Sequence, residues 1–184
     1  MSKFIYGQFY GFPIKKAAAL MLIFILVWAW AKHYIADKKE KNIFWKIGNL
    51  LLVLAMLCVI VSVTLTSRGG VSEVILTPFY SLVEMRSSPD LGRSVFMNIF
   101  LFFPLGLTLP FALPEKWNRK ALLAILFAFL LSFAIEFLQY YYHLGRAETD
   151  DVICNTIGCA IGTLAYILER KCNRRSRHGF IVLK

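Results

Sequence analysis

Apolar side chains are gathered into five stretches, which are separated by short polar and charged segments. A helix that crosses a bilayer needs roughly 20 mostly apolar residues, and these stretches reach or approach that length. The pattern therefore predicts an all-α, polytopic transmembrane bundle of about five helices. A four-helix version, in which the first stretch does not cross, also fits the pattern. The stretches cover residues 17–35, 47–65, 94–113, 121–142 and 152–168.

The polar segments divide the chain into four parts. Residues 1–16 are rich in aromatic side chains but too short to span, which favours a position in the membrane interface. Residues 17–65 contain two predicted helices joined by a basic loop, residues 66–168 contain the other three, and residues 169–184 form a basic tail. The composition agrees, because 58% of the 184 residues are hydrophobic and the mean hydropathy is +0.61. An ordinary soluble domain needs more polar surface than that.

The positive charges are confined to particular connecting segments, and their distribution predicts the orientation. Five, three and six Lys or Arg residues lie in residues 32–46, 114–120 and 169–184, whereas the alternating segments 66–93 and 143–151 hold four between them. Cytoplasmic loops are rich in Lys and Arg, so the C-terminus is expected in the cytoplasm. Basic residues are not interleaved with polar and aromatic ones, which argues against a nucleic-acid partner and leaves membrane lipids as the expected partner.

A few polar residues lie inside or beside the predicted spans, toward the side opposite the basic loops. Glu136 and Gln139 are three residues apart near the outer end of the fourth helix, so they share a face. Asp151 and Asn155 share a face at the start of the fifth helix. Since these two helices are joined by a short loop, we expect the four side chains to meet. The full set of expected ligand-binding residues is Asn98, Glu136, Gln139, Arg146, Asp150, Asp151 and Asn155.

Several of these residues also have a purely structural interpretation. Asp150 or Asp151 suits the N-terminus of the fifth helix, where a negative charge is favourable. Asn155 suits a hydrogen bond between helices. Glu136 is harder to explain in this way, because a carboxylate at membrane depth is costly unless it is paired or hydrated. Arg146, on the loop that follows, is its expected ion-pair partner, and binding of Arg146 to lipid phosphate is the alternative.

Small residues and proline predict how the helices pack. Gly158 and Gly162 are four residues apart and permit another helix to approach closely. Pro104 and Gly106 lie in the middle of the third helix and are expected to kink it. The four cysteines show neither a CxxC pair nor a Cys/His metal spacing, so no metal and no other cofactor is expected.

Three segments, taken in order, resemble the VanZ family of bacterial membrane proteins. The first is similar to a short NLIPF-type loop, although residues 73–75 stand where the family usually places an Arg. The second is similar to an N-x-x-x-F-x-P-x-G helix, and the third to an E-x-x-Q, G-R and D-D-x-x-x-N-T-x-G signature. The matching residues are Leu76-Thr77-Pro78-Phe79, then 98–106, then 136–139, 145–146 and 150–158, all within about residues 74–168.

The resemblance implies a protein of the bacterial cytoplasmic membrane, in a family whose founding member is associated with low-level resistance to teicoplanin, a lipid-bearing glycopeptide. One hypothesis is an outward-facing polar cleft that binds a lipid-linked cell-wall precursor or a lipoglycopeptide, with Arg146 holding an anionic group. A second is a membrane enzyme with Glu136 as base and Asp150 and Asp151 near a divalent cation. Adjacent side chains diverge by about 100° on a helix, which weakens the second hypothesis. A third is a structural protein whose polar residues only lock helices together.

Overall fold

The computed structural model describes residues 19, 22–29, 31, 43–65, 74–84, 86–114 and 117–181. The expected interfacial segment 1–16 lies outside these residues, and so does most of the expected basic loop between the first two helices. The described positions of the first apolar stretch, residues 19, 22–29 and 31, are all helical.

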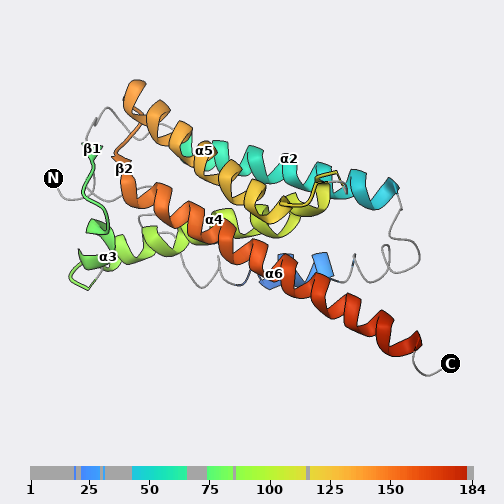
Figure 1. Cartoon of the computed structure of the whole chain (residues 1–184). Coiled ribbons are helices and arrows are strands. Elements are labelled where there is room, and N and C mark those ends of the chain that lie inside the picture. The colour runs from blue at the N-terminus through green and yellow to red at the C-terminus, as the bar shows by residue number, and fades with distance from the viewer. Residues whose placement is uncertain are drawn as a thin grey trace.

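Four long helices form a bundle, and three short elements lie together at one end of it (Figure 1). Each of the four contains a segment long and apolar enough to cross a membrane. The prediction of an all-α transmembrane bundle is therefore confirmed. In chain order the elements are α2 (Ile43–Leu65), β1 (Val74–Ile75), α3 (Tyr80–Glu84), α4 (Pro89–Ala112), α5 (Lys120–Tyr141), β2 (Ala147–Glu148) and α6 (Thr149–Ile181).

Helix α4 is the centre of this bundle, because it contacts α2, α3, α5 and α6. Phe102 and Leu105 on α4 are fully buried, and Ile60 of α2 and Ala128 of α5 belong to the same apolar core. The outward sides of the helices are apolar as well, as Leu130 on α5 shows with 55% of its surface exposed. A helix that is apolar all round is typical of a membrane span, whose outer side faces hydrocarbon.

Helices α4 and α6 approach so closely that glycine is required where they touch. A Cβ atom added at Gly158 would collide with the backbone carbonyl of Ile99, and one at Gly162 would collide with that of Phe103. Gly106 of α4 meets the α6 backbone in the same way. The predicted close approach at Gly158 and Gly162 is confirmed, and the partner helix is α4.

The helix limits differ most from the expected ones at the start of α4 and at the end of α6. Helix α4 begins at Pro89 rather than near residue 94, because proline suits the first turn, where its missing N–H would have no helical partner. It runs on as one helix through Pro104, where the sequence predicts a kink. Helix α6 continues to Ile181, past the expected end near residue 168, so the first part of the basic tail is helical.

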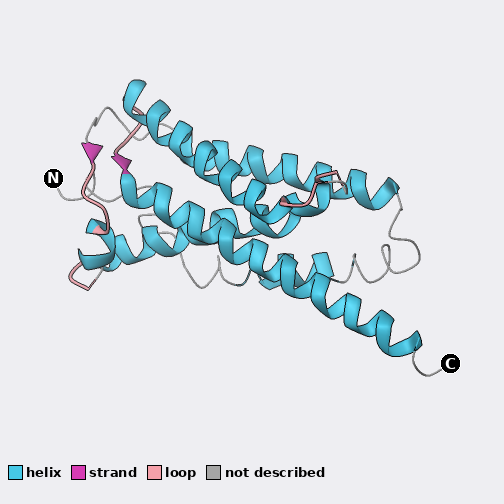
Figure 2. Cartoon of the chain, in the orientation of Figure 1, coloured by secondary structure: helices cyan, strands magenta, loops and turns pink. Residues whose placement is uncertain are grey.

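The connection between α2 and α4 contains structure that the hydrophobic pattern does not indicate. Strand β1 pairs in parallel with β2, with Val74 opposite Ala147 and Ile75 opposite Glu148 (Figure 2). This two-stranded sheet lies at the end of the bundle where α5 ends and α6 begins (Figure 1). It holds residues 74–84 beside the start of α6, which is where the polar side chains gather.

Candidate functional site

Polar side chains are buried together at the end of the bundle that carries the small sheet. Glu136 and Glu148 are 7% and 8% exposed, and Asp150 and Asp151 are 3% and 8% exposed. Carboxylates are seldom buried unless they are paired or hydrogen-bonded. The contacts that compensate them therefore decide what this cluster does.

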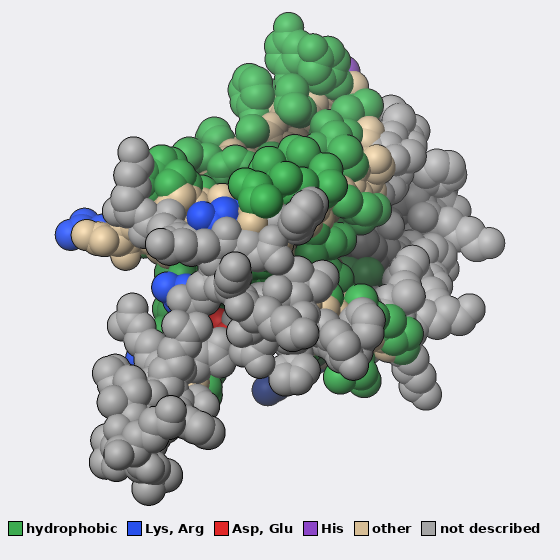
Figure 3. Space-filling model, turned by 90° about the vertical axis from the view of Figure 1, so that its right-hand side faces the viewer, with side chains coloured by type: hydrophobic (Ala, Val, Ile, Leu, Met, Phe, Trp, Pro, Cys, Tyr) green, Lys and Arg blue, Asp and Glu red, His purple; other side chains and the backbone are tan. Residues whose placement is uncertain are grey.

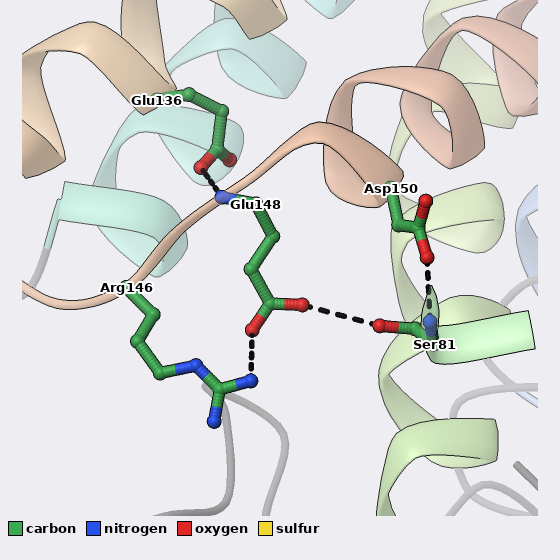
Figure 4. Close-up of polar contacts among 5 residues, drawn as sticks. All are labelled: Ser81, Glu136, Arg146, Glu148 and Asp150. Atoms are coloured by element: carbon green, nitrogen blue, oxygen red, sulfur yellow. Dashed lines mark hydrogen bonds and ion pairs between the residues drawn. The ribbon is translucent and has the colours of Figure 1, made fainter. Parts of the chain in front are cut away.

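Glu148 is the centre of these contacts (Figure 4). Its Oε1 forms an ion pair of 2.7 Å with Nη2 of Arg146, and its Oε2 accepts a hydrogen bond of 3.2 Å from the hydroxyl of Ser81. Its backbone N–H donates to Oε2 of Glu136 over 2.8 Å. Glu148, on β2, thereby joins α3, α5 and the loop between α5 and β2.

Asp150 ties the segment that precedes α3 to the first turn of α6. Its Oδ1 accepts the backbone N–H of Phe79 at 2.5 Å, and its Oδ2 accepts that of Ser81 at 2.6 Å. Phe79 has a φ of 64°, which turns the chain at this point. The first turns of helices have N–H groups without helical partners, so Asp150 satisfies the start of α3, across 71 residues of sequence.

The expected capping role of the two aspartates is only partly observed. Both lie in the first turn of α6, where negative charge is favourable. The oxygens of Asp150, however, are engaged by the other segment. Asp151 lies within electrostatic reach of Glu136, Glu148, Asp150 and Arg146. Among the residues that the structure describes, none forms a hydrogen bond with the Asp151 carboxyl.

The expected ion pair between Arg146 and Glu136 is wrong. Arg146 pairs with Glu148 instead, and Glu136 is compensated by a backbone N–H. The physical reason is the parallel pairing of β2 with β1, which extends the chain after Arg146 and places the Glu148 carboxylate beside the guanidinium. A backbone donor suits Glu136, because it lies next to β2 at the end of α5.

The three amide side chains in the expected set lie at different places around the cluster. Gln139 faces α2, and its Nε2 donates to the backbone carbonyl of Thr64 over 2.7 Å. Asn155 lies one turn further along α6 than Asp151, and its Nδ2 donates to Oγ of Ser132 over 2.8 Å. Asn98 on α4 is fully buried. Asn155 thus forms the interhelical hydrogen bond that the sequence suggests, between α5 and α6.

Two residues of the cluster are absent from the expected set, namely Ser81 and Glu148. Ser81 follows the segment Leu76-Thr77-Pro78-Phe79, whose likeness to a family motif was the one available signal that this loop belongs to the site. Glu148 lies on the short connection between the fourth and fifth predicted helices, where a single acidic residue gives no sign of a role in the site. The described residues contain no group of three or more His, Cys, Asp or Glu side chains arranged to hold a metal ion.

The opposite end of the bundle has a different character. Figure 3 shows the molecule from that end. Lys and Arg side chains are visible there, and apolar side chains cover the adjoining side of the bundle. The described basic residues near this end lie at the starts of α2 and α5 and in the later turns of α6. They include Lys46, Arg119, Lys120, Arg170 and Lys171.

These features define the class, a polytopic helical membrane protein with a buried polar cluster at one end of its bundle. The chain belongs to the family described as VanZ/LLP1, which matches residues 49–170. It is similar to the Protein VanZ of Enterococcus faecium, with 31% identity over 96 residues, or 52% of this chain and 53% of that protein. The chain thus spans about half the length of this relative. No solved structure matches.

Proposed function

We propose that the polar cluster faces the outside of the bacterial cytoplasmic membrane and binds the polar part of an amphiphile. The proposed ligand is a lipid-linked cell-wall precursor or a lipoglycopeptide of the teicoplanin kind, and its capture contributes to glycopeptide resistance. Membership of the VanZ/LLP1 family and the likeness to Protein VanZ support this class of function. The cluster covers the residues that carry the likeness most specifically, from Glu136 to Asn155.

The observation that carries the proposal is the ion pair between Arg146 and Glu148. Its two side chains are 13% and 9% exposed, so the pair lies at the boundary of the buried cluster. A guanidinium binds carboxylate and phosphate groups through two parallel hydrogen bonds. An anionic group of the ligand would replace Glu148 as the partner of Arg146, and the Glu148 carboxylate would then accept hydrogen bonds from hydroxyl or amide groups of the ligand.

The distribution of charge supports the orientation. Lys46, Arg119, Lys120, Arg170 and Lys171 lie toward the end opposite the cluster, and cytoplasmic ends of spanning helices are rich in such residues. The C-terminus is then cytoplasmic, and the cluster lies in the outer leaflet. That is the side from which a cell-wall precursor or a glycopeptide reaches the membrane.

A structural role for the cluster is the second candidate, and the completeness of its contacts favours it. Asp150 and Glu148 both use two carboxylate oxygens in contacts with other segments. A cluster that only fastened residues 74–84 to α6 would need the same contacts. The two candidates differ in what happens when Arg146 is changed without loss of the protein from the membrane.

Susceptibility to teicoplanin separates the two candidates. We expect cells that express Arg146→Ala to be as susceptible as cells without the protein, because the guanidinium that binds the anionic group of the ligand is gone. Arg146→Lys keeps the charge beside Glu148 but lacks the planar fork, and we expect a partial loss. Arg119→Ala, at the opposite end, removes the same side chain from an exposed position and is the matched control. Membrane abundance of each variant is measured by quantitative immunoblotting.

Two results would contradict the binding proposal. If cells with the wild-type chain are no less susceptible than cells without it, the resistance function is wrong. If Arg146→Ala and Arg146→Lys both protect as well as Arg119→Ala at equal abundance, the cluster is structural. Removing one partner of a buried ion pair is strongly destabilising, so Arg146→Ala can lower the abundance of the protein. In that case Arg146→Lys, which keeps the charge, decides between the two candidates.

A further inference from the structure

The segment around α3 has its polar and apolar side chains arranged opposite to those of a water-exposed helix. Ser81 is 3% exposed and points into the cluster, where it contacts Glu148. Tyr80 and Val83, three residues apart and hence on one face, are 41% and 71% exposed. A short helix on a water-facing surface would bury its apolar side chains and expose its hydroxyl group.

The exposed apolar side chains of this segment continue beyond α3. Leu76 is 74% exposed and Phe79 is 54% exposed, so four apolar or aromatic side chains between residues 76 and 83 lie on the surface. We call Leu76, Phe79, Tyr80 and Val83 the loop patch. The segment is not free to turn these side chains inward, because Asp150 holds the backbone N–H groups of Phe79 and Ser81.

The position of the loop patch indicates what covers it. Helix α3 packs against α4, and α4 contains the candidate span Leu91–Ala112. Phe96, about 10 Å along α4 from its first residue at 1.5 Å per residue, is 46% exposed and belongs to the apolar side of that span. The loop patch therefore lies beside the start of an apolar span, and the level at which a span begins is the depth of the head-group region.

The charges and aromatic rings at this level fit a lipid surface. Arg86, two residues after α3, is exposed and is suited to contact lipid phosphate. At the same end of the bundle, Phe137 and Tyr141 of α5 are both exposed and stack with ring centroids 6.1 Å apart, and Tyr141 meets Tyr142 at 5.0 Å. Tyrosine is enriched where a membrane protein passes from hydrocarbon to water.

We propose that residues 76–83 form a membrane anchor, whose loop patch inserts into the leaflet beside the polar cluster. The partner is the lipid surface itself, with apolar side chains at the acyl boundary and Arg86 at the phosphates. The anchor fixes the depth of Ser81, and through it the depth of the Glu148 contacts. It depends on the membrane class of the protein and not on any ligand of the cluster.

Spin-label accessibility in nanodiscs tests the proposal. Labels are placed on Val83→Cys and Leu76→Cys, and the collision rate of each is measured with oxygen, which concentrates in the bilayer, and with a neutral nickel chelate, which stays in water. Leu130→Cys, exposed in the middle of α5, is the lipid reference. Asn118→Cys, exposed in the turn before α5, is the water reference. The exposed Cys58 and Cys172 are replaced by serine, and the buried cysteines stay.

We expect the oxygen-to-nickel ratio at Val83 and Leu76 to lie several-fold above that at Asn118 and below that at Leu130, because the loop patch lies at the head-group level and Leu130 lies in the middle of a span. A ratio at both positions equal to that of Asn118 would mean that the loop patch faces water, and would overturn the proposal. Low collision rates with both reagents would mean that protein covers the patch, such as a second copy of the chain, and would overturn it equally. Two label positions guard against one substitution disturbing the fold.

Discussion

Replacing Gly158 by alanine is expected to destabilise the protein by about 1–3 kcal/mol, and replacing it by valine by more. The added Cβ would overlap the backbone carbonyl of Ile99. A side chain could rotate away, but the backbone of α4 can move only if the two helices separate. Helix α4 contacts every other described long helix, so the separation would disturb the whole bundle. The thermal midpoint of purified protein in detergent, read by size-exclusion chromatography after heating, measures the effect.

Gly48→Ala is the matched control for this prediction. Gly48 also lies within a predicted span, on α2, but a Cβ there would meet nothing within 4 Å. We expect its thermal midpoint to match that of the wild type or rise slightly, since alanine is the better helix former. If Gly158→Ala is as stable as Gly48→Ala, then α4 and α6 are not packed backbone against backbone as described.

Replacing Asp150 by alanine is expected to release residues 76–84 from α6. The change leaves the backbone N–H groups of Phe79 and Ser81 without the carboxylate that accepts them. A hydrogen bond to a charged group contributes about 1.5–3 kcal/mol, so the local cost is roughly 3 kcal/mol or more. Amide hydrogen exchange reports local opening, and we expect the protection of the peptide that contains Ser81 to fall by two orders of magnitude or more, about what 3 kcal/mol implies.

The neighbouring aspartate supplies the control. Asp151→Asn changes another buried carboxyl on the same turn of α6, but no described residue hydrogen-bonds to it. We expect this variant to leave exchange in residues 76–84 unchanged. Equal exchange in the Asp150→Ala variant and the wild type would show that Asp150 does not hold this segment.

The hydrophobic pattern was sufficient to predict the fold class, because segment length alone limits what can cross a bilayer. The spacing of Gly158 and Gly162 also predicted a close approach of another helix, since small residues four apart on a span are typical of helix–helix contacts. The hydrophobic pattern could not give the end of α6, because the helix continues past residue 168 into basic residues. Extending a helix that is already formed costs less than starting one, so these turns need no apolar periodicity of their own.

The site was predictable only in outline. Glu136, Asp150 and Asp151 gather at one end of the bundle, as expected of residues near the short connection between two helices. The partner of Arg146 was predicted wrongly, because the pairing of β1 with β2 joins two-residue strands separated by more than 70 positions. A strand of two residues gives no periodic signal in the sequence. The pairing of these strands nevertheless determines that Glu148 contacts the guanidinium of Arg146.

The place of Ser81 in the site depends on long-range contacts in the same way. A serine in a loop gives no sign that its hydroxyl is buried. Among the described residues, its hydrogen bonds to side chains are those with Glu148 and Asp150, far along the chain. The family-like segment just before it was the only indication that the loop reaches the site. Long-range contacts of this kind depend on tertiary packing, which local sequence patterns do not encode.

The central claim, that the polar cluster faces the outside, is tested most directly by labelling cysteines in intact cells with a membrane-impermeant maleimide. Gly145→Cys reports the cluster, since a Cβ at Gly145 meets nothing within 4 Å. The native Cys172, exposed in the later turns of α6, reports the opposite end in a second strain. Cys58 is replaced by serine in both strains, and Cys172 also in the first. We expect Gly145→Cys to react in intact cells and Cys172 only after permeabilisation. Reaction of Cys172 in intact cells, with Gly145→Cys protected until permeabilisation, would contradict the claim.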